Sequence, residues 1–332
     1  MCYKKMMGES TVLIGEQPAT LLGKKITKGS LQLRSKYKEE DENCVIYKEG
    51  VDYIVGYIDG TISRTKDSSI PDFANNILYD KVEFDHTEYA SYGNHDFFVY
   101  ADYEAVYDFE GDINSSRKAR FVETEDIIRK RQPLKILIYG DSISTGLEAS
   151  CFERTYYGRL KNYLNSNFDN MHVSIENRSV GGHTTREGLK VLNGDDTKGD
   201  IAILAFGMND ANCNENNPYT NNVPLREYRS NIEEMINILR KRQIRDILLV
   251  SPCWPNQLWK WSVNNSSSNV GKYAEVLDEL ADIYDCKFAN VTQIWSNVLK
   301  RKKSEDLLGN NINHPNDFGH WIYFLTIKSI FF

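Results

Sequence analysis

From about residue 130 onward, the sequence alternates short apolar runs with longer stretches of helical periodicity. The apolar runs lie at 134–139, 172–180, 201–206, 246–251 and 286–291. Between and after them we predict helices at 153–165, 185–192, 225–243, 270–284 and from about Gly319. Apolar runs without polar alternation indicate strands that are buried on both faces. Strands that alternate with helices in this way predict a parallel β-sheet covered by helices on both sides.

The part of the chain before residue 130 is β-rich and has a different pattern. Residues 52–64 form two β-prone runs around Asp59-Gly60, and this dipeptide predicts a hairpin with a type I′ turn. Further β-prone stretches lie at 31–37, 44–50 and 96–109, and no convincing amphipathic helix occurs between residues 10 and 120. We therefore predict a small antiparallel sandwich or jelly roll over residues 1–128, followed by an α/β domain over residues 132–332.

Composition and charge exclude several classes of protein. A formal charge of −7 argues against nucleic-acid and anionic-membrane partners, which favour a basic surface. No apolar run is long enough for a signal peptide or a membrane span, so the expected location is the cytoplasm. The six cysteines are scattered without a CxxC pair, and we expect reduced thiols and neither a metal site nor a cofactor.

Polar residues and glycines follow the first three strands of the predicted parallel sheet. "YGDSIS" places Ser142 near a helix start, "NRSVGGHTT" contains Gly181-Gly182, and "FGMNDAN" contains Asn209. In sheets of this kind, binding sites form from the loops at the carboxyl ends of the strands. Each loop alone also fits a simple structural reading, either a helix cap or a turn. Together they offer a hydroxyl nucleophile and hydrogen-bond donors for an oxyanion.

A histidine near the C-terminus completes this set of groups. In "NNINHPNDFGH", Pro315 disfavours helical backbone at His314 and places it on a stiff loop before the last helix. A histidine in that position suits a general base for acyl transfer. His320 falls inside the predicted helix, and we expect it to be structural.

The four loops together resemble the signature blocks of the SGNH (GDSL-type) hydrolases. The matching residues are Gly140-Asp141-Ser142, Gly182, Gly207-Met208-Asn209-Asp210 and His314-Pro315, and the resemblance covers roughly residues 132–332. It implies a flavodoxin-like three-layer α/β/α fold and ester hydrolysis through an acyl-serine. It also implies that Ser142 is the nucleophile and His314 the base. The N–H groups of Ser142 and Gly182 and the side chain of Asn209 would form the oxyanion hole, with Asp141 and Asp210 in support.

One residue departs from the family pattern. The family usually has an aspartate three residues before the catalytic histidine, where this chain has Asn311. The aspartate normally accepts the ring Nδ1–H and stabilises the imidazolium. Three alternatives follow: the Asn311 oxygen orients His314, a backbone carbonyl does so and leaves a Ser-His dyad, or the site is weakened or inactive.

The loop after the fourth strand suggests a substrate. It contains Trp254, Trp259 and Trp261, whose flat faces suit sugar rings, although a hydrophobic loop core fits them equally well. A β-rich region followed by such a hydrolase domain also resembles two-domain bacterial carbohydrate acetylesterases. We therefore predict a serine esterase that cleaves small acyl esters, O-acetyl groups above all, on a carbohydrate such as a glycan or an oligosaccharide. The alternatives are a lysophospholipase or thioesterase and a catalytically silent carbohydrate-binding protein.

Overall fold

Contacts divide the chain of this computed structural model into two compact units. The structure describes residues 3–107, 121–168, 171–214, 216, 218–262 and 269–331. The first unit spans 1–111, 256–260 and 296–319, and the second spans 112–255, 261–295 and 320–332.

This division by contacts differs from the linear boundary near residue 130, which stays a prediction. Residues 256–260 and 296–319, which the prediction assigned to the second domain, belong to the first unit. The reason is that these segments carry buried polar groups whose partners lie in the β-rich region. Lys302, for example, pairs with Glu9.

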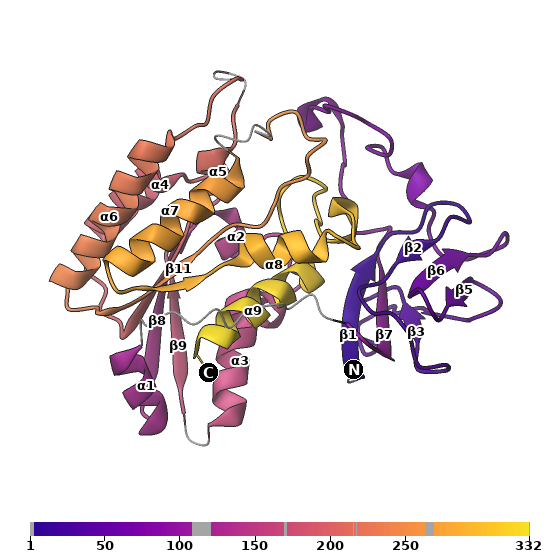
Figure 1. Cartoon of the computed structure of the whole chain (residues 1–332), viewed down its shortest axis with the longest axis horizontal. Coiled ribbons are helices and arrows are strands. Elements are labelled where there is room, and N and C mark those ends of the chain that lie inside the picture. Colours follow the sequence, from indigo (N-terminus) through magenta and orange to yellow (C-terminus); the bar gives the residue numbers. More distant parts are fainter. Residues whose placement is uncertain are drawn as a thin grey trace. The chain divides into compact units, whose positions relative to one another are not determined.

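The second unit contains a parallel sheet, which confirms the predicted fold class (Figure 1). Its strand order is β12-β11-β10-β8-β9, and every neighbouring pair is parallel. The strands are β8 (Leu134–Gly140), β9 (Val173–Asn177), β10 (Ile201–Ala205), β11 (Asp246–Val250) and β12 (Lys287–Ala289). Because the chain adds β9 on one side of β8 and β10 on the other, the order reverses at β8. Such a reversal is where open α/β sheets bind ligands.

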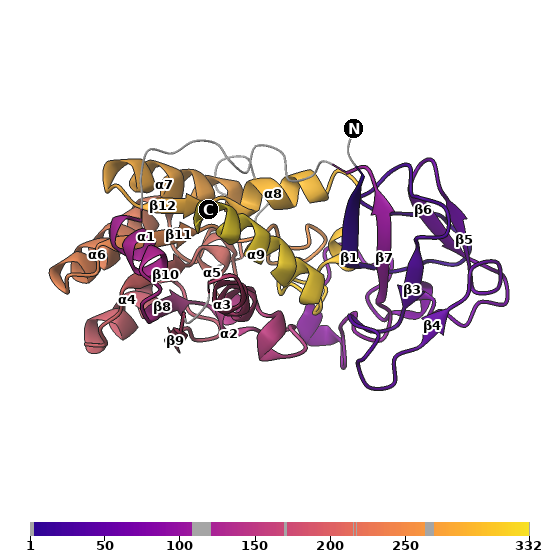
Figure 2. The same ribbon diagram turned by 90° about the horizontal axis from the view of Figure 1, so that it is seen from below.

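Helices cover both faces of this sheet (Figure 2). On one face, Leu137, Tyr139 and Leu204 pack into a core with α4 (Thr185–Gly194), α6 (Leu225–Lys241) and α7 (Val270–Ile283). On the other face, the Tyr156 and Tyr323 rings of α3 (Tyr156–Asn167) and α9 (Asp317–Phe331) stack 5.7 Å apart. The shorter helices are α1 (Val122–Arg129), α2 (Ser142–Thr145), η3 (Phe152–Arg154), α5 (Met208–Ala211) and α8 (Val291–Val298). Burial on both faces explains why the strands read as continuous apolar runs.

The first unit contains two antiparallel sheets, which confirms the predicted β-rich region. One has the order β1-β7-β3-β4 and the other β2-β6-β5. Their strands are β1 (Lys4–Thr11), β2 (Ala19–Thr20), β3 (Gln32–Arg34), β4 (Ile46–Tyr47), β5 (Tyr53–Gly56), β6 (Thr61–Arg64) and β7 (Val99–Ala105). The 3-10 helices are η1 (Phe73–Asn75), η2 (His86–Glu88) and η4 (Ser304–Asp306). Aromatic rings form a buried cluster beside β7, in which Tyr37 and Tyr100 meet edge to face at 5.7 Å.

The hairpin of β5 and β6 is present, but its turn differs from the prediction. Gly56 pairs with Thr61, so the loop has the four residues 57–60. Gly60 has a φ of 67°, and Asp59 is absent from the residues with positive φ. A type I′ turn needs positive φ at both central residues, so the turn is of another kind. The predicted strand at 96–109 shortens to β7, and residues 108–109 lie outside the described residues.

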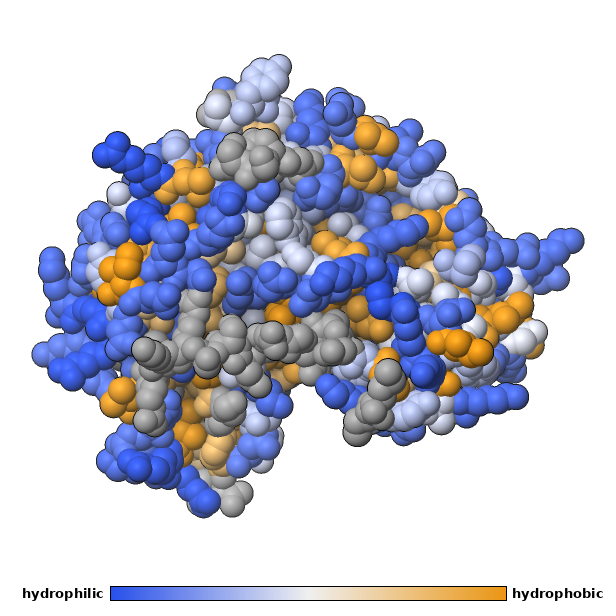
Figure 3. All heavy atoms as spheres, viewed as in Figure 1, coloured by the Kyte–Doolittle hydropathy of each residue, from blue (hydrophilic) through white to orange (hydrophobic). Residues whose placement is uncertain are grey.

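On the face shown in Figure 3, apolar side chains occur in small groups among hydrophilic ones. Among the helices of the described residues, none combines the length and the apolar character that crossing a membrane requires.

Candidate active site

The loop after β8 presents Ser142 at the first position of α2. Asp141 caps this helix, because its Oδ1 accepts the Ile143 N–H at 2.9 Å. The residue before Asp141 must be glycine, because a Cβ at Gly140 would lie only 2.8 Å from the Ala205 carbonyl oxygen. Ser142 itself is 4% exposed. The sequence therefore places Ser142 just after the carboxyl end of β8, on a helix start.

The loop after β9 approaches this serine. A Cβ at Gly181 would lie 3.8 Å from the Ser142 Cβ. Gly182 has a φ of 78°, in the left-handed region that favours glycine, and no heavy atom would lie within 4 Å of its Cβ. The Gly182 backbone therefore borders open space beside the serine loop. Such a position leaves room for a ligand next to the Gly182 backbone.

The loop after β10 contacts the loop after β9 through Asn209. Its Nδ2 donates to the His183 carbonyl at 2.9 Å. An amide NH₂ has two donors, so a second N–H of this half-buried side chain remains for an oxyanion. Residues from three different loops thus converge within the second unit: Ser142, Gly182 and Asn209.

Two buried carboxyl groups support these loops. The Asp210 Oδ1 accepts the backbone N–H of Thr185 at 2.9 Å and its hydroxyl at 2.5 Å, which fixes α5 to the start of α4. Burial raises the pKa of Asp210 to about 6. Burial also raises the pKa of Asp141 to about 7, and the nearby charge of Asp210 raises it further. Both groups therefore titrate close to neutral pH.

The loop that carries His314 lies in the first unit and is organised by Asn310. The Asn310 Oδ1 accepts three backbone N–H groups, those of Ile312 at 3.0 Å, Asn313 at 3.0 Å and His314 at 2.9 Å. Its Nδ2 lies 3.1 Å from the Asn313 Oδ1 and 3.0 Å from the His314 Nδ1. The three N–H donors dictate that the oxygen end of the amide faces the backbone. The NH₂ end must then face the imidazole ring.

This arrangement selects a tautomer of His314. An amide NH₂ nitrogen donates and does not accept, so the contact at 3.0 Å requires an unprotonated Nδ1. The neutral ring then carries its proton on Nε2. A general base of the Ser-His type needs the opposite tautomer, with Nδ1 protonated and Nε2 bare.

Asn310 is the residue that our sequence reasoning missed, since its alternatives for orienting His314 were Asn311 and a backbone carbonyl. Asn311 has a φ of 58°, and its Oδ1 accepts from Asn94 at 3.2 Å and from Asn256 at 3.3 Å. The hydrogen bond to the ring comes instead from the residue four positions before His314. The readiness of asparagine to bond backbone groups two to four residues ahead is the signal that could have identified Asn310.

The tryptophans are packed rather than exposed as sugar platforms. Trp259 and Trp261 are each 9% exposed, and the Trp259 Nε1 donates to the His86 Nδ1 at 3.1 Å. Trp254 lies against α7, where a Cβ at Gly271 would come within 3.3 Å of its ring. Burial removes the flat faces that stacking on a sugar ring requires. Burial of Trp259 and Trp261 fits the loop-core alternative, while sugar binding by the three tryptophans stays a prediction. The stretch 263–268 of this loop, which contains Asn264 and Asn265, lies outside the described residues.

The other groups near the site are structural. His320 is fully buried in α9, and its Nε2 lies 3.3 Å from the Leu147 carbonyl oxygen. Within the described part of the chain, no group of three or more His, Cys, Asp or Glu side chains could hold a metal ion. The second unit thus brings together a serine hydroxyl and amide donors, and the first unit carries the His314 imidazole.

Comparisons with known proteins show the family of this chain. A model of the GDSL-like Lipase/Acylhydrolase family matches residues 138–322. A homolog of isoamyl acetate-hydrolyzing esterase 1 from Mus musculus is 27% identical over 213 residues, which cover 58% of this chain and 79% of that protein. The Rattus norvegicus homolog is 28% identical over 189 residues, or 52% of this chain and 70% of that protein.

A solved structure is similar in fold. A catalytic mutant of Axe2, an acetylxylan esterase from Geobacillus stearothermophilus, has a TM-score of 0.50 and 19% sequence identity to this chain. The match covers 60% of this chain and 94% of that structure.

Proposed function

Since this chain belongs to the GDSL-like lipase/acylhydrolase family and is an ester hydrolase, we propose that it cleaves small acyl esters through an acyl-Ser142 intermediate. The observation that carries the proposal is the convergence of the loops after β8, β9 and β10 at the point where the strand order reverses. Among the described residues, no glycine with a positive φ follows β11 or β12.

In the proposed reaction, the Ser142 Oγ attacks the carbonyl carbon of the ester and gives up its proton to His314. The negative charge that develops on the carbonyl oxygen is stabilised by the N–H groups of Ser142 and Gly182 and by the second N–H of the Asn209 side chain. The C–O bond to the alcohol then breaks, and His314 returns the proton to the departing oxygen. A water molecule attacks the acyl-serine by the same route and releases the carboxylic acid.

Of the three alternatives for orienting His314, the Asn310 contact favours a weakened site. The productive tautomer must place a proton on Nδ1, where it would face the NH₂ group of Asn310 instead of an acceptor. Asn310 also lacks the negative charge that stabilises the imidazolium in a complete triad. We therefore propose a slow esterase whose rate is limited by the state of this ring.

For the acyl group, the names of two relatives support acetate, because both are homologs of an isoamyl acetate-hydrolyzing esterase. For the alcohol part, carbohydrate stays a prediction from the sequence, and the burial of Trp259 and Trp261 takes away one argument for it. A panel of isoamyl acetate, acetylated oligosaccharides and esters of longer acyl chains separates these substrates. Faster cleavage of the longer chains would favour the lysophospholipase or thioesterase alternative.

The test of the mechanism compares wild type with Ser142→Ala on p-nitrophenyl acetate. We expect hydrolysis and labelling by a fluorophosphonate to disappear in the variant. Ser144→Ala is the matched control, because Ser144 lies in the same short helix and its Oγ contacts the Tyr156 hydroxyl at 2.9 Å. Equal rates for wild type and Ser142→Ala would reject the proposal. A protein that binds acetylated sugars but never reacts with the probe would be the silent carbohydrate-binding alternative.

A further inference from the structure

We propose that Asn94, a buried side chain of the β-rich N-terminal region, is a positioning residue for His314. This inference rests on the proposed function, because it assigns His314 the role of base. It gives the N-terminal region a task in catalysis that requires no contact with substrate.

Asn94 holds the backbone that leads to His314. Its own N–H donates to the Gly309 carbonyl at 2.7 Å. Its Nδ2 lies 2.9 Å from the Leu308 carbonyl oxygen and 3.1 Å from that of Glu305. The same nitrogen lies 3.2 Å from the Asn311 Oδ1, and the Asn94 side chain is fully buried. A single amide therefore bonds three points of the segment 305–311.

The orientation of the Asn94 amide is fixed from the other side. The Asn76 Nδ2 donates to the Asn94 Oδ1 at 3.2 Å and to the Gly93 carbonyl at 2.7 Å. The oxygen of Asn94 thus faces Asn76, and its NH₂ group faces the His314 loop. Aspartate at this position would keep the acceptor and the volume but would lose both donors.

The loop transmits the position of Gly309 to His314. The Gly309 N–H donates to the His314 carbonyl at 2.8 Å, and Leu308 forms an antiparallel bridge with Pro315. Between these points, Asn310 links the His314 backbone to its ring. Hydrogen bonds therefore connect Gly309 to the backbone of His314, and Asn310 connects that backbone to the imidazole ring. A shift of Gly309 should move the ring with it.

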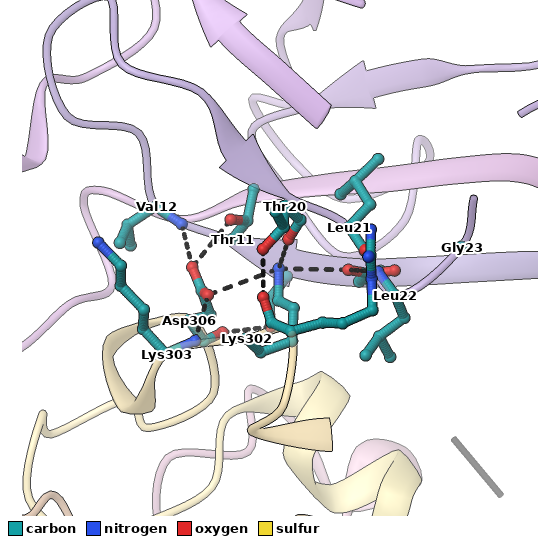
Figure 4. A network of polar contacts seen from close by, with 12 residues as sticks. Thr11, Val12, Thr20, Leu21, Leu22, Gly23, Lys302, Lys303 and Asp306 are labelled. Carbon is teal, nitrogen blue, oxygen red and sulfur yellow. Dashed lines mark hydrogen bonds and ion pairs between the residues drawn. The ribbon is translucent and has the colours of Figure 1, made fainter. Parts of the chain in front are cut away.

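A buried network holds the preceding turn to β1 (Figure 4). The Lys302 Nζ lies 3.2 Å from the Glu9 Oε1 and 3.6 Å from the Asp306 Oδ2. The Asp306 Oδ1 accepts the Thr11 hydroxyl at 2.8 Å and the Val12 N–H at 2.9 Å. Removing one partner of a buried ion pair is strongly destabilising, because the other charge is left uncompensated. This network therefore fixes Lys302, just before the segment that Asn94 holds, and Asp306 at its start.

The experiment compares Asn94→Asp with wild type in the full chain. The matched control is Asp52→Ala, which also removes buried hydrogen bonds in the first unit but has its contacts at Lys48 and Ser69. We expect Asn94→Asp to lower kcat about 100-fold, the typical effect of a misplacement of about 1 Å, with KM within about threefold. Asp52→Ala should change kcat only in proportion to the unfolded fraction seen by circular dichroism.

A second readout does not depend on catalysis. Nitrogen-15 spectra of the histidine rings, assigned with His314→Gln, should report a proton on the Nε2 of His314 in wild type and a different ring environment in Asn94→Asp. If both kcat and the His314 signals of Asn94→Asp match wild type, the proposal is overturned. It is also overturned if Asp52→Ala lowers kcat as much as Asn94→Asp at equal folded fraction. If Ser142→Ala retains activity, the proposed function fails, while the ring spectra still decide whether Asn94 positions His314.

Discussion

Replacing Asn310 by aspartate should increase esterase activity. Both carboxylate oxygens accept, so one keeps the N–H bonds of Ile312, Asn313 and His314, which now lie at 2.9–3.0 Å. The other replaces the NH₂ group that lies 3.0 Å from the His314 Nδ1. The variant should therefore favour a proton on Nδ1 and leave Nε2 bare to accept the proton of Ser142.

Two contributions set the size of this gain. The wild-type contact must be broken to reach the productive tautomer, and a neutral hydrogen bond contributes about 0.5–1.5 kcal/mol. A charged hydrogen bond to the imidazolium adds about 1.5–3 kcal/mol in the variant. Together they lower the barrier by about 2–4.5 kcal/mol, which corresponds to a rise in kcat of roughly 30-fold to 2000-fold. The loss of the contact to the Asn313 Oδ1 at 3.1 Å works against this gain, unless that amide reverses.

The assay is the single-turnover hydrolysis of p-nitrophenyl acetate at pH 8, with Asn311→Asp as the matched control. Asn311→Asp makes the same chemical change one residue later, where the side chain meets Asn94 and Asn256. We expect no gain from it. A large gain from Asn311→Asp with none from Asn310→Asp would refute this reasoning and would assign the orienting position to Asn311.

Three further predictions concern the supports of the site. Asn209→Ala should lower kcat about 100-fold to 1000-fold with little change in KM, which steady-state kinetics would measure, because one oxyanion donor contributes about 2.7–4 kcal/mol. The folded-state pKa of Asp141, about 7, lies above its ordinary value of 3.8, so its contribution to stability is present at low pH and is lost as the pH rises from about 4 to 7. Asp141→Asn keeps the cap, because the amide oxygen also accepts a hydrogen bond, but its side chain does not titrate. The urea midpoint of this variant should therefore fall less than that of wild type between pH 4.5 and pH 8. Lys302→Met should cost about 3–5 kcal/mol in urea unfolding, because it leaves the buried Glu9 carboxyl without its cation; an unchanged midpoint would contradict the role of this pair.

The pattern of the sequence predicted most of the second unit. Each predicted apolar run contains a strand of the sheet, because burial on both faces demands continuous apolar residues. Predicted helix limits such as 225–243 lie within a few residues of those observed for α6. Helices α1 and α8 were missed, since both are only eight residues long and leave little periodicity to detect.

The first unit and the His314 loop were harder to predict. Strand β1 was missed because polar residues such as Glu9 and Thr11 are buried in it, against the alternation that marks a half-buried strand. Their partners lie nearly 300 positions later in the chain, and no local pattern reveals such pairs. The contact of Asn310 is local, at four residues from His314, and was missed for a different reason. Which of several neighbouring asparagines meets the ring depends on the backbone of the loop, where Asn311 adopts a left-handed conformation.

The assignment of 296–319 to the first unit has a consequence for the modular history of this protein. A gene segment that encodes only the family match, residues 138–322, contains every family signature but lacks the partners of Lys302, Asp306 and Asn311. A fragment cut at residue 138 would leave the buried side chains of Lys302, Asp306 and Asn311 without their partners Glu9, Thr11 and Asn94. The N-terminal region therefore cannot be exchanged by simple fusion at residue 130. An exchange of this region would have to include residues 296–319, because they belong to the same unit.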